Sequence, residues 1–276
     1  MYTNNYYCLI AGLPDLILNE NPKDLTSFQF RLELAEHLAL KDHNLLELIY
    51  RPYDNNNLLN LLLQKDFQYD ILGNYTEDYL KAQIIEPTDI VRYLKLFITD
   101  FNSETFDTSP LFLENKLQEL FYDYVLNTNN DFIKEWFTFD RNIKNILTAV
   151  NCHQYGYSTE KQLIPDHISD GLYESLIRKI PMPELFADEE LPYLEQILQI
   201  AEMAIDASEK EKATDNIKWS FLDEITVFHY FTIEKILSFV IKLTMVDRWR
   251  ELDSDTGKKL LKRLISDLEM SYSFAE

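Results

Sequence analysis

The sequence predicts an all-α protein, and three observations lead to that prediction. Glycine makes up only 5 of the 276 residues, far below the usual ~7%, which disfavours folds that need many tight turns. Apolar residues recur with the 3.6-residue period of a helix in several segments, whereas the two-residue alternation of a strand is scarce. Hydrophobic residues form 46% of the chain, enough to bury a sizeable core.

The first hundred residues contain three expected helices. Leu25–Leu40 and Leu45–Tyr50 are candidates, and Ile90–Ile98 forms an apolar run behind Pro87-Thr88-Asp89, where a capping side chain marks a helix start. Two short pieces look β-like instead, Tyr6–Ile10 and Gln83–Ile85.

Apolar stripes with helical spacing dominate the rest of the chain. In each of them the apolar residues lie on one face of the expected helix and charged residues on the opposite face. The stripes consist of Leu117, Leu120, Phe121, Tyr124 and Val125; Phe132, Trp136, Ile143, Ile146, Leu147 and Val150; Leu191, Leu194, Ile197, Leu198, Ala201 and Ile205; and Leu260, Leu261, Leu264, Ile265 and Leu268. Trp219–Leu252 has neither proline nor glycine, which predicts one or two long helices. Breaks are expected at Arg51–Asn57, Ser103–Pro110, Asn127–Asp131, Gln154–Asp170 and Ile180–Pro192.

The charge balance limits the classes of partner. With 26 basic and 47 acidic residues the formal net charge is −21, which disfavours binding to nucleic acid and to anionic lipid and suits a basic protein partner. No basic residue precedes Lys23, so no signal peptide is expected, and no apolar run is long enough for direct membrane insertion. Two isolated cysteines, Cys8 and Cys152, fit reduced thiols in a cytoplasmic protein.

A faint internal repeat appears in three six-residue cores, each with polar residues at its first and fourth positions. The first positions lie 85 and 90 residues apart, at 57, 142 and 232. The polar pairs are Asn57 and Asn60, Asn142 and Asn145, and Thr232 and Lys235. The pattern predicts one helical body over 1–276 with sub-repeats of about 1–105, 106–190 and 191–276, although amphipathic helices can also resemble one another by chance.

An acidic stretch precedes the third stripe and contains no basic residue. Its acids are Glu184, Asp188, Glu189, Glu190 and Glu195. It fits a solvated loop with the first turn of a helix, where acids suit the positive end of the helix dipole. The alternative is a docking patch for a basic partner.

Motifs for catalysis, cofactors and metals are missing, and none of these sites is expected. The sequence has no phosphate-binding GxxxxGK[ST] loop, no GxGxxG behind a strand and no HExxH. Asp253-Ser254-Asp255-Thr256-Gly257 superficially matches an aspartyl phosphotransferase loop, but no hydrophobic strand precedes it, so a capped helix–loop–helix turn is favoured.

Four segments resemble a known family. They are Tyr6–Leu16, Tyr53–Leu59, Trp136–Leu147 and Phe231–Leu237. Together they resemble an uncharacterised bacterial family associated with V-type ATP synthases. That family is itself similar to the C subunit of V-type ATPases, whose eukaryotic counterpart is the d subunit. The similarity extends from Tyr6 to about Leu268.

This resemblance implies an all-helical funnel of three related subdomains with pseudo-threefold symmetry. It implies a non-catalytic central-stalk subunit whose partners are the rotor ring and the other stalk subunits, cytoplasmic and peripheral on the inner membrane. The sequence departs from the C subunit after Asn145, where the Arg-rich segment is replaced by Thr148, Ala149 and Val150. A helical adaptor and a stand-alone helical enzyme remain the alternatives.

Overall fold

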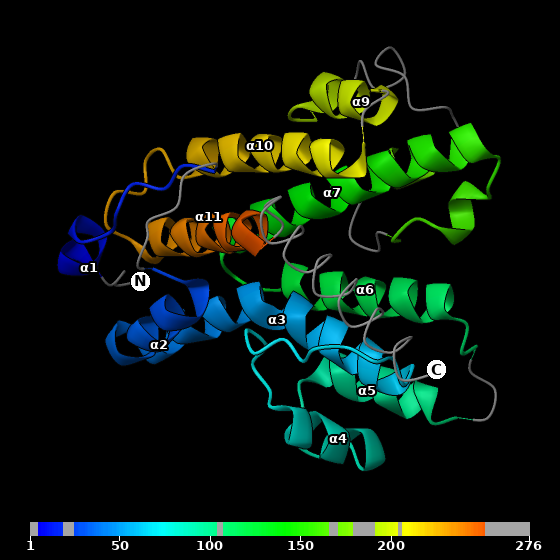
Figure 1. Cartoon of the computed structure of the whole chain (residues 1–276), viewed down its shortest axis with the longest axis horizontal. Helices are drawn as coiled ribbons and strands as arrows, with labels where there is room; N and C mark the ends of the chain where they lie inside the picture. The colour runs from blue at the N-terminus through cyan, green and yellow to red at the C-terminus, as the bar shows by residue number, and fades with distance from the viewer. Residues whose placement is uncertain are drawn as a thin grey trace, which may run out of the picture. The chain divides into compact units, whose positions relative to one another are not determined.

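The computed structural model describes residues 5–18, 25–103, 107–165, 171–178, 191–203 and 206–251. Within these ranges it contains eleven α-helices, one short 3₁₀ helix and no β-strand, which confirms the all-α prediction (Figure 1). The helices are α1 (Tyr7–Ala11), α2 (Ser27–His37), α3 (Leu40–Leu62), α4 (Glu77–Ile85), α5 (Arg92–Phe101), α6 (Pro110–Leu126), α7 (Asp131–Tyr155), α8 (Gly171–Arg178), α9 (Leu194–Glu202), α10 (Ala207–Ile225) and α11 (Ile233–Glu251), with η1 at Thr159–Lys161.

By its packing the chain divides into two compact units. The terminal unit joins the two ends of the chain, Met1–His37 and Phe231–Glu276. In it α2 packs on α11, where the rings of Phe30 and Phe239 meet edge to face at 5.1 Å. The Ser27 N–H, at the start of α2, donates a 2.6 Å hydrogen bond to the Asp247 carboxylate.

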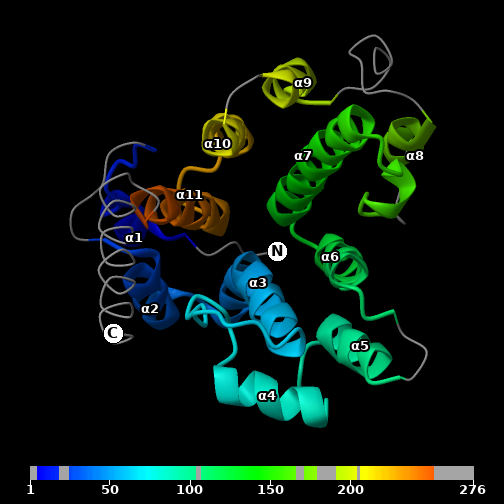
Figure 2. The same ribbon diagram turned by 45° about the vertical axis from the view of Figure 1, so that its right-hand side comes forward.

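The central unit is Leu38–Tyr230. Its helices pack largely in chain order: α5 on α6, α6 on α7, α7 on α9, and α9 on α10 (Figure 2). The stripe predicted on α6 forms part of this core, because residues four apart share one helix face and Leu117, Phe121 and Val125 are all buried. Phe121 meets Phe137 of α7 edge to face at 5.2 Å, a favoured aromatic geometry.

Side chains near the helix ends account for several boundaries. Asn130 and Asp206 accept hydrogen bonds from backbone N–H groups in the first turns of α7 and α10, at 3.0 and 2.8 Å, as N-caps do. α7 ends at Tyr155, and the next residue, Gly156, has a left-handed φ of +71° that costs glycine no strain. The predicted break at Asn127–Asp131 is confirmed, because α6 ends at Leu126 and α7 begins at Asp131.

Four local predictions were wrong. Arg51–Asn57 is not a break, since α3 continues through it and contains Pro52. The β-like pieces Tyr6–Ile10 and Gln83–Ile85 lie largely or wholly in α1 and α4, because periodicity cannot separate a short apolar strand from a short helix. The helix expected directly after Asp89 begins only at Arg92.

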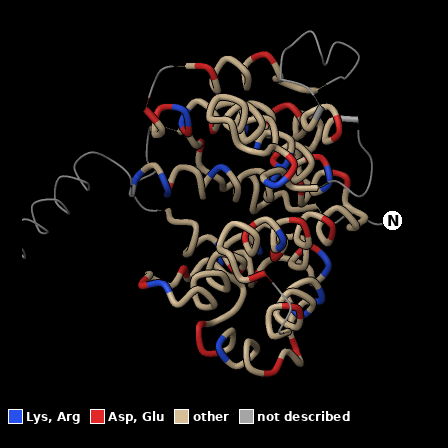
Figure 3. Tube along the Cα trace, turned by 90° about the vertical axis from the view of Figure 1, so that its right-hand side faces the viewer, with Lys and Arg blue, Asp and Glu red and all other residues tan. Residues whose placement is uncertain are grey.

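Other predictions concern parts of the chain outside the described residues. They include the stripe Leu260–Leu268, the loop at 253–257 and most of the break at Ile180–Pro192. The three sub-repeats stay a prediction. No described helix is both long and apolar enough to cross a bilayer. Acidic positions recur along the described trace instead of gathering in one segment (Figure 3).

Candidate functional site

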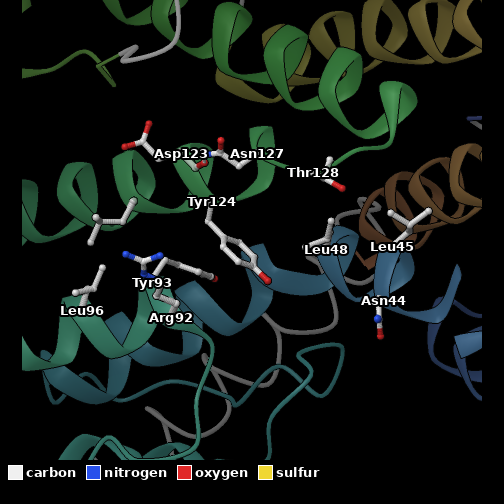
Figure 4. Close-up of a pocket in the computed structure, with 11 residues that line it drawn as sticks. Asn44, Leu45, Leu48, Arg92, Tyr93, Leu96, Asp123, Tyr124, Asn127 and Thr128 are labelled. Carbon is white, nitrogen blue, oxygen red and sulfur yellow. Dashed lines mark hydrogen bonds between the residues drawn. The ribbon is translucent and has the colours of Figure 1, made fainter. Parts of the chain in front are cut away.

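A groove of about 780 Å³ lies in the central unit between α3, α5 and α6 (Figure 4). Each helix contributes residues three or four positions apart, which lie on one helix face. The lining residues are Asn44, Leu45 and Leu48 from α3; Arg92, Tyr93 and Leu96 from α5; Leu120, Asp123 and Tyr124 from α6; and Asn127 and Thr128 after it. The volume is within the range of about 300–1,000 Å³ that ligand pockets occupy.

Two tyrosines in the lining of this groove contact each other. The rings of Tyr93 and Tyr124 stack with centroids 5.1 Å apart. The Tyr93 hydroxyl donates a 2.6 Å hydrogen bond to the side-chain oxygen of Asn55, and burial raises the pKa of Tyr93 well above its ordinary value. Tyr93 therefore stays neutral, and the hydrogen bond that its hydroxyl donates links α5 to α3.

The rest of the lining has the character of a binding surface. Leucines supply apolar contact, Leu96 is 46% exposed, and Arg92 and Asp123 provide one cation and one anion. Such a lining, apolar with a few polar groups, is typical of sites that bind and orient a ligand or a partner's side chain. Within the described part of the chain, no group of three or more His, Cys, Asp or Glu is placed to hold a metal ion.

A buried polar cluster on α3 fastens the loop between α3 and α4. Both oxygens of Asp54 are used: one accepts from the backbone N–H groups of Asn74 and Tyr75 at 2.6 and 3.1 Å, and the other from the Asn74 amide at 2.7 Å. Arg51 lies 3.2 Å from Asp54 and 4.9 Å from the Tyr75 ring centroid. Burial raises the pKa of Asp54, while Arg51 and these hydrogen bonds oppose the rise.

The same loop requires a glycine at position 73. A Cβ atom there would lie 2.8 Å from Asp54 Oδ1 and 3.2 Å from the Asn57 side-chain nitrogen. Both neighbours are held by hydrogen bonds, so neither can move away without breaking contacts.

We therefore expect Gly73→Ala to lower the free energy of unfolding by about 1–3 kcal/mol, as overpacking does. Gly12→Ala is the matched control, because its nearest atoms are 3.5 Å away and its φ of −89° is ordinary. Urea unfolding followed by circular dichroism measures both. Equal effects of the two substitutions would contradict this account.

A second buried cluster joins α6, α7 and α10 around Asp140. The carboxylate accepts from the Tyr122 hydroxyl at 2.7 Å and from the Lys218 ammonium at 2.6 Å, and Lys144 lies 2.9 Å away. Burial alone would raise the pKa of Asp140, but Lys144, Lys218 and the hydrogen bonds hold it far below its ordinary value. The cluster ties three helices together by charge-assisted hydrogen bonds.

Two of the asparagines from the predicted repeat make the same pair of hydrogen bonds to the loop that follows their helix. Asn57 donates to the Asp70 carbonyl at 2.9 Å and accepts from the Asp70 N–H at 3.0 Å. Asn145 binds both backbone groups of Ile164 in the same way, at 2.8 and 2.9 Å. We call this arrangement an asparagine clamp: one side-chain amide on a long helix holds a single residue of the loop that follows. In the predicted repeat Asn57 is equivalent to Asn142 and Asn60 to Asn145, so the two clamps lie at different positions of the six-residue cores.

The remaining predicted positions do not gather into one site. Asn60 and Asn142 are half-buried, Thr232 precedes α11 and contacts Glu234, and Lys235 lies in the first turn of α11. Of the acidic stretch, Glu195 is exposed in the first turn of α9. Glu184, Asp188, Glu189 and Glu190 lie outside the described residues.

The groove and the Asp140 cluster were not predicted from the sequence. Asp140 carried a usable signal, because it interrupts the apolar stripe of α7 between Trp136 and Ile143, both of which are buried. The groove carried none, since the pattern of one helix does not show how α3, α5 and α6 pack around a shared hollow.

Comparison with known proteins assigns a family. A family model described as "Protein of unknown function (DUF2764)" matches residues 3–272. The chain belongs to the DUF2764 family. The match includes the whole of Tyr6–Leu268, and the family description names no function. No curated protein and no solved structure matches the chain.

Proposed function

We propose that this DUF2764 protein is a non-catalytic central-stalk subunit of a V-type ATP synthase or ATPase. In this role it lies between the rotor shaft and the membrane rotor ring and couples them during proton or sodium transport. The family resemblance in four segments of the sequence is the source of the proposal.

The observation that carries the proposal is the pair of asparagine clamps. Asn57 on α3 and Asn145 on α7 hold the loops behind their helices by the same two hydrogen bonds. The clamps lie at the first position of one six-residue core and the fourth position of another, so they support a shared way of fastening a loop to a long helix, while the register of the repeat stays a prediction. The clamps also suit a spacer that transmits torque, because closely packed helices with fixed loops transmit strain with little deformation.

Purification from native membranes tests the proposal. A tagged copy of the protein should bring down rotor-ring and stalk subunits, and raising the salt should release part of them, because exposed charge pairs are screened within about 10 Å at 0.1 M salt. Deletion of the gene should uncouple ATP hydrolysis from ion transport. A motor that stays assembled and coupled without the protein would overturn the proposal.

The groove between α3, α5 and α6 favours a second candidate, a helical adaptor that binds a partner's side chains there. Leu96→Glu places a charge on a half-exposed wall and should abolish such binding without unfolding the protein. An adaptor unrelated to the motor would lose its partner in this variant, and the rotary ATPase would be intact even when the gene is deleted.

A further inference from the structure

The turn between α10 and α11 exposes large apolar side chains. We call Val227–Tyr230 the aromatic turn. The exposed fractions are 54% for Val227, 82% for Phe228 and 66% for Tyr230. Three such side chains within four consecutive residues differ from the single exposed hydrophobics that occur on any protein surface.

The backbone of the turn holds this exposure in place. Thr226 is only 1% exposed, and its hydroxyl donates a 2.6 Å hydrogen bond to the Leu222 carbonyl. The Val227 N–H donates to the Glu224 carbonyl at 3.2 Å, and the His229 N–H donates to the Thr226 carbonyl at 3.0 Å. The backbone of the turn is thus anchored at Thr226, so little backbone ordering cost is left for binding.

The charge next to the turn is negative. Asp223 and Glu224 are both exposed in the last turn of α10, which contains no basic residue. A helix C-terminus already carries negative partial charge, so acids there are unfavourable for the isolated helix. Glu224 accepts a 2.9 Å hydrogen bond from the Tyr193 hydroxyl, but both acids are still exposed and can attract a cation of a partner protein.

We propose that the aromatic turn is a docking surface for a partner protein that offers an apolar pocket bordered by lysine or arginine. The Phe228 ring fills the pocket, and Asp223 and Glu224 face its basic border. A second copy of this chain is disfavoured by its own net charge of −21, and anionic lipid is disfavoured for the same reason. This surface would serve a rotary-motor subunit and an adaptor equally.

Site-specific crosslinking identifies what covers the turn. A photoreactive phenylalanine analogue at position 228 is irradiated in cells that naturally contain the protein, and the crosslinked peptide is sequenced. Ile85 is the matched control position, because it is 84% exposed at the end of α4 in the same unit. We expect one partner protein, crosslinked from position 228 only, through an apolar segment flanked by basic residues.

The partner that crosslinking identifies is then purified in its free form. Its affinity for the protein and for the variants tests the proposed apolar and charged contacts. Phe228→Ser should weaken binding by at least about tenfold, as truncation of a central aromatic anchor does, while Ile85→Ser leaves it unchanged. Circular dichroism and thermal unfolding should be the same for both variants and the parent, because both side chains are exposed. The double variant Asp223→Asn/Glu224→Gln should reduce the dependence of binding on salt.

Three results would overturn the proposal. One is an absence of crosslinks from position 228 beyond those from position 85. Another is crosslinking to lipid, to a second copy of the chain or to a segment without basic residues. The third is a Phe228→Ser variant that is folded and binds the crosslinked partner as tightly as the parent.

Discussion

Asp140→Asn is expected to lower the free energy of unfolding at neutral pH by about 2–4 kcal/mol. The substitution keeps the size of the side chain but removes the charge that Lys218 and Lys144 face at 2.6 and 2.9 Å. Removing one partner of a buried ion pair typically costs about 3–5 kcal/mol. The expected value is lower here because the Lys144 side chain is 44% exposed and can turn toward water.

The same variant should change how stability depends on pH. The pKa of Asp140 is held below its ordinary value in the folded protein, so its ionised form favours folding above the unfolded pKa of about 3.9. This stabilisation is lost as the pH falls below about 5, when the unfolded chain takes up protons more readily than the folded one. The difference between parent and Asp140→Asn should therefore shrink steadily on acidification.

Urea unfolding at several pH values measures both effects, with tryptophan fluorescence as the probe, to which Trp136, buried on α7, contributes. Glu77→Gln is the control, because Glu77 pairs with Lys81 on the exposed surface of α4 at 2.6 Å. This variant should unfold like the parent throughout, since exposed ion pairs contribute little. A constant difference between parent and Asp140→Asn across the acidic range would show that the pKa of Asp140 is not depressed.

Periodicity predicted the helices well because it reports which face is buried. Phe132, Trp136 and Ile143 were placed on one apolar stripe, and all three are buried on α7. Sequence signals for the ends of helices were nearly as informative. The polar run Asn127–Asp131, for example, marks the connection between α6 and α7. Both signals are local, so they can be recognised without knowing what packs against the helix.

The polar run Arg51–Asn57 was misinterpreted because its partners are distant in sequence. Asp54 and Asn57 face inward and bind the backbone of residues 13 to 21 positions further along. Polarity alone predicts a loop at such a place, while hydrogen bonding makes it the buried face of a helix. The groove escaped prediction for a related reason, since α3, α5 and α6 meet only in the folded chain.

The asparagine clamps lead to the second large expected effect, in Asn145→Ala. Asn145 and Ile164 are 3% and 5% exposed, so the substitution leaves a buried N–H and a buried C=O without their partner. Each unsatisfied buried group costs about 1–3 kcal/mol. We expect a loss of about 2–4 kcal/mol in the free energy of unfolding. Asn57→Ala should cost less, because Asp70 is only half-buried and water can replace the amide.

Asn142→Ala and Asn60→Ala are the matched controls. Each residue lies one turn from a clamp on the same helix and is half-buried, and neither takes part in the clamp hydrogen bonds. Both substitutions should change the unfolding free energy by less than about 0.5 kcal/mol. Urea unfolding of the four variants then yields a ranking, with Asn145→Ala most harmful, Asn57→Ala next, and the two controls near the parent.

Asn145→Asp separates the hydrogen bonds from the volume of the side chain. The aspartate fills the same space and still accepts from the Ile164 N–H, but at neutral pH its other oxygen faces the Ile164 carbonyl instead of donating to it. The buried carboxyl should have a raised pKa, so acidification restores the donor and part of the lost stability. If Asn142→Ala proved as harmful as Asn145→Ala, the loss of stability would not come from the two hydrogen bonds between Asn145 and Ile164.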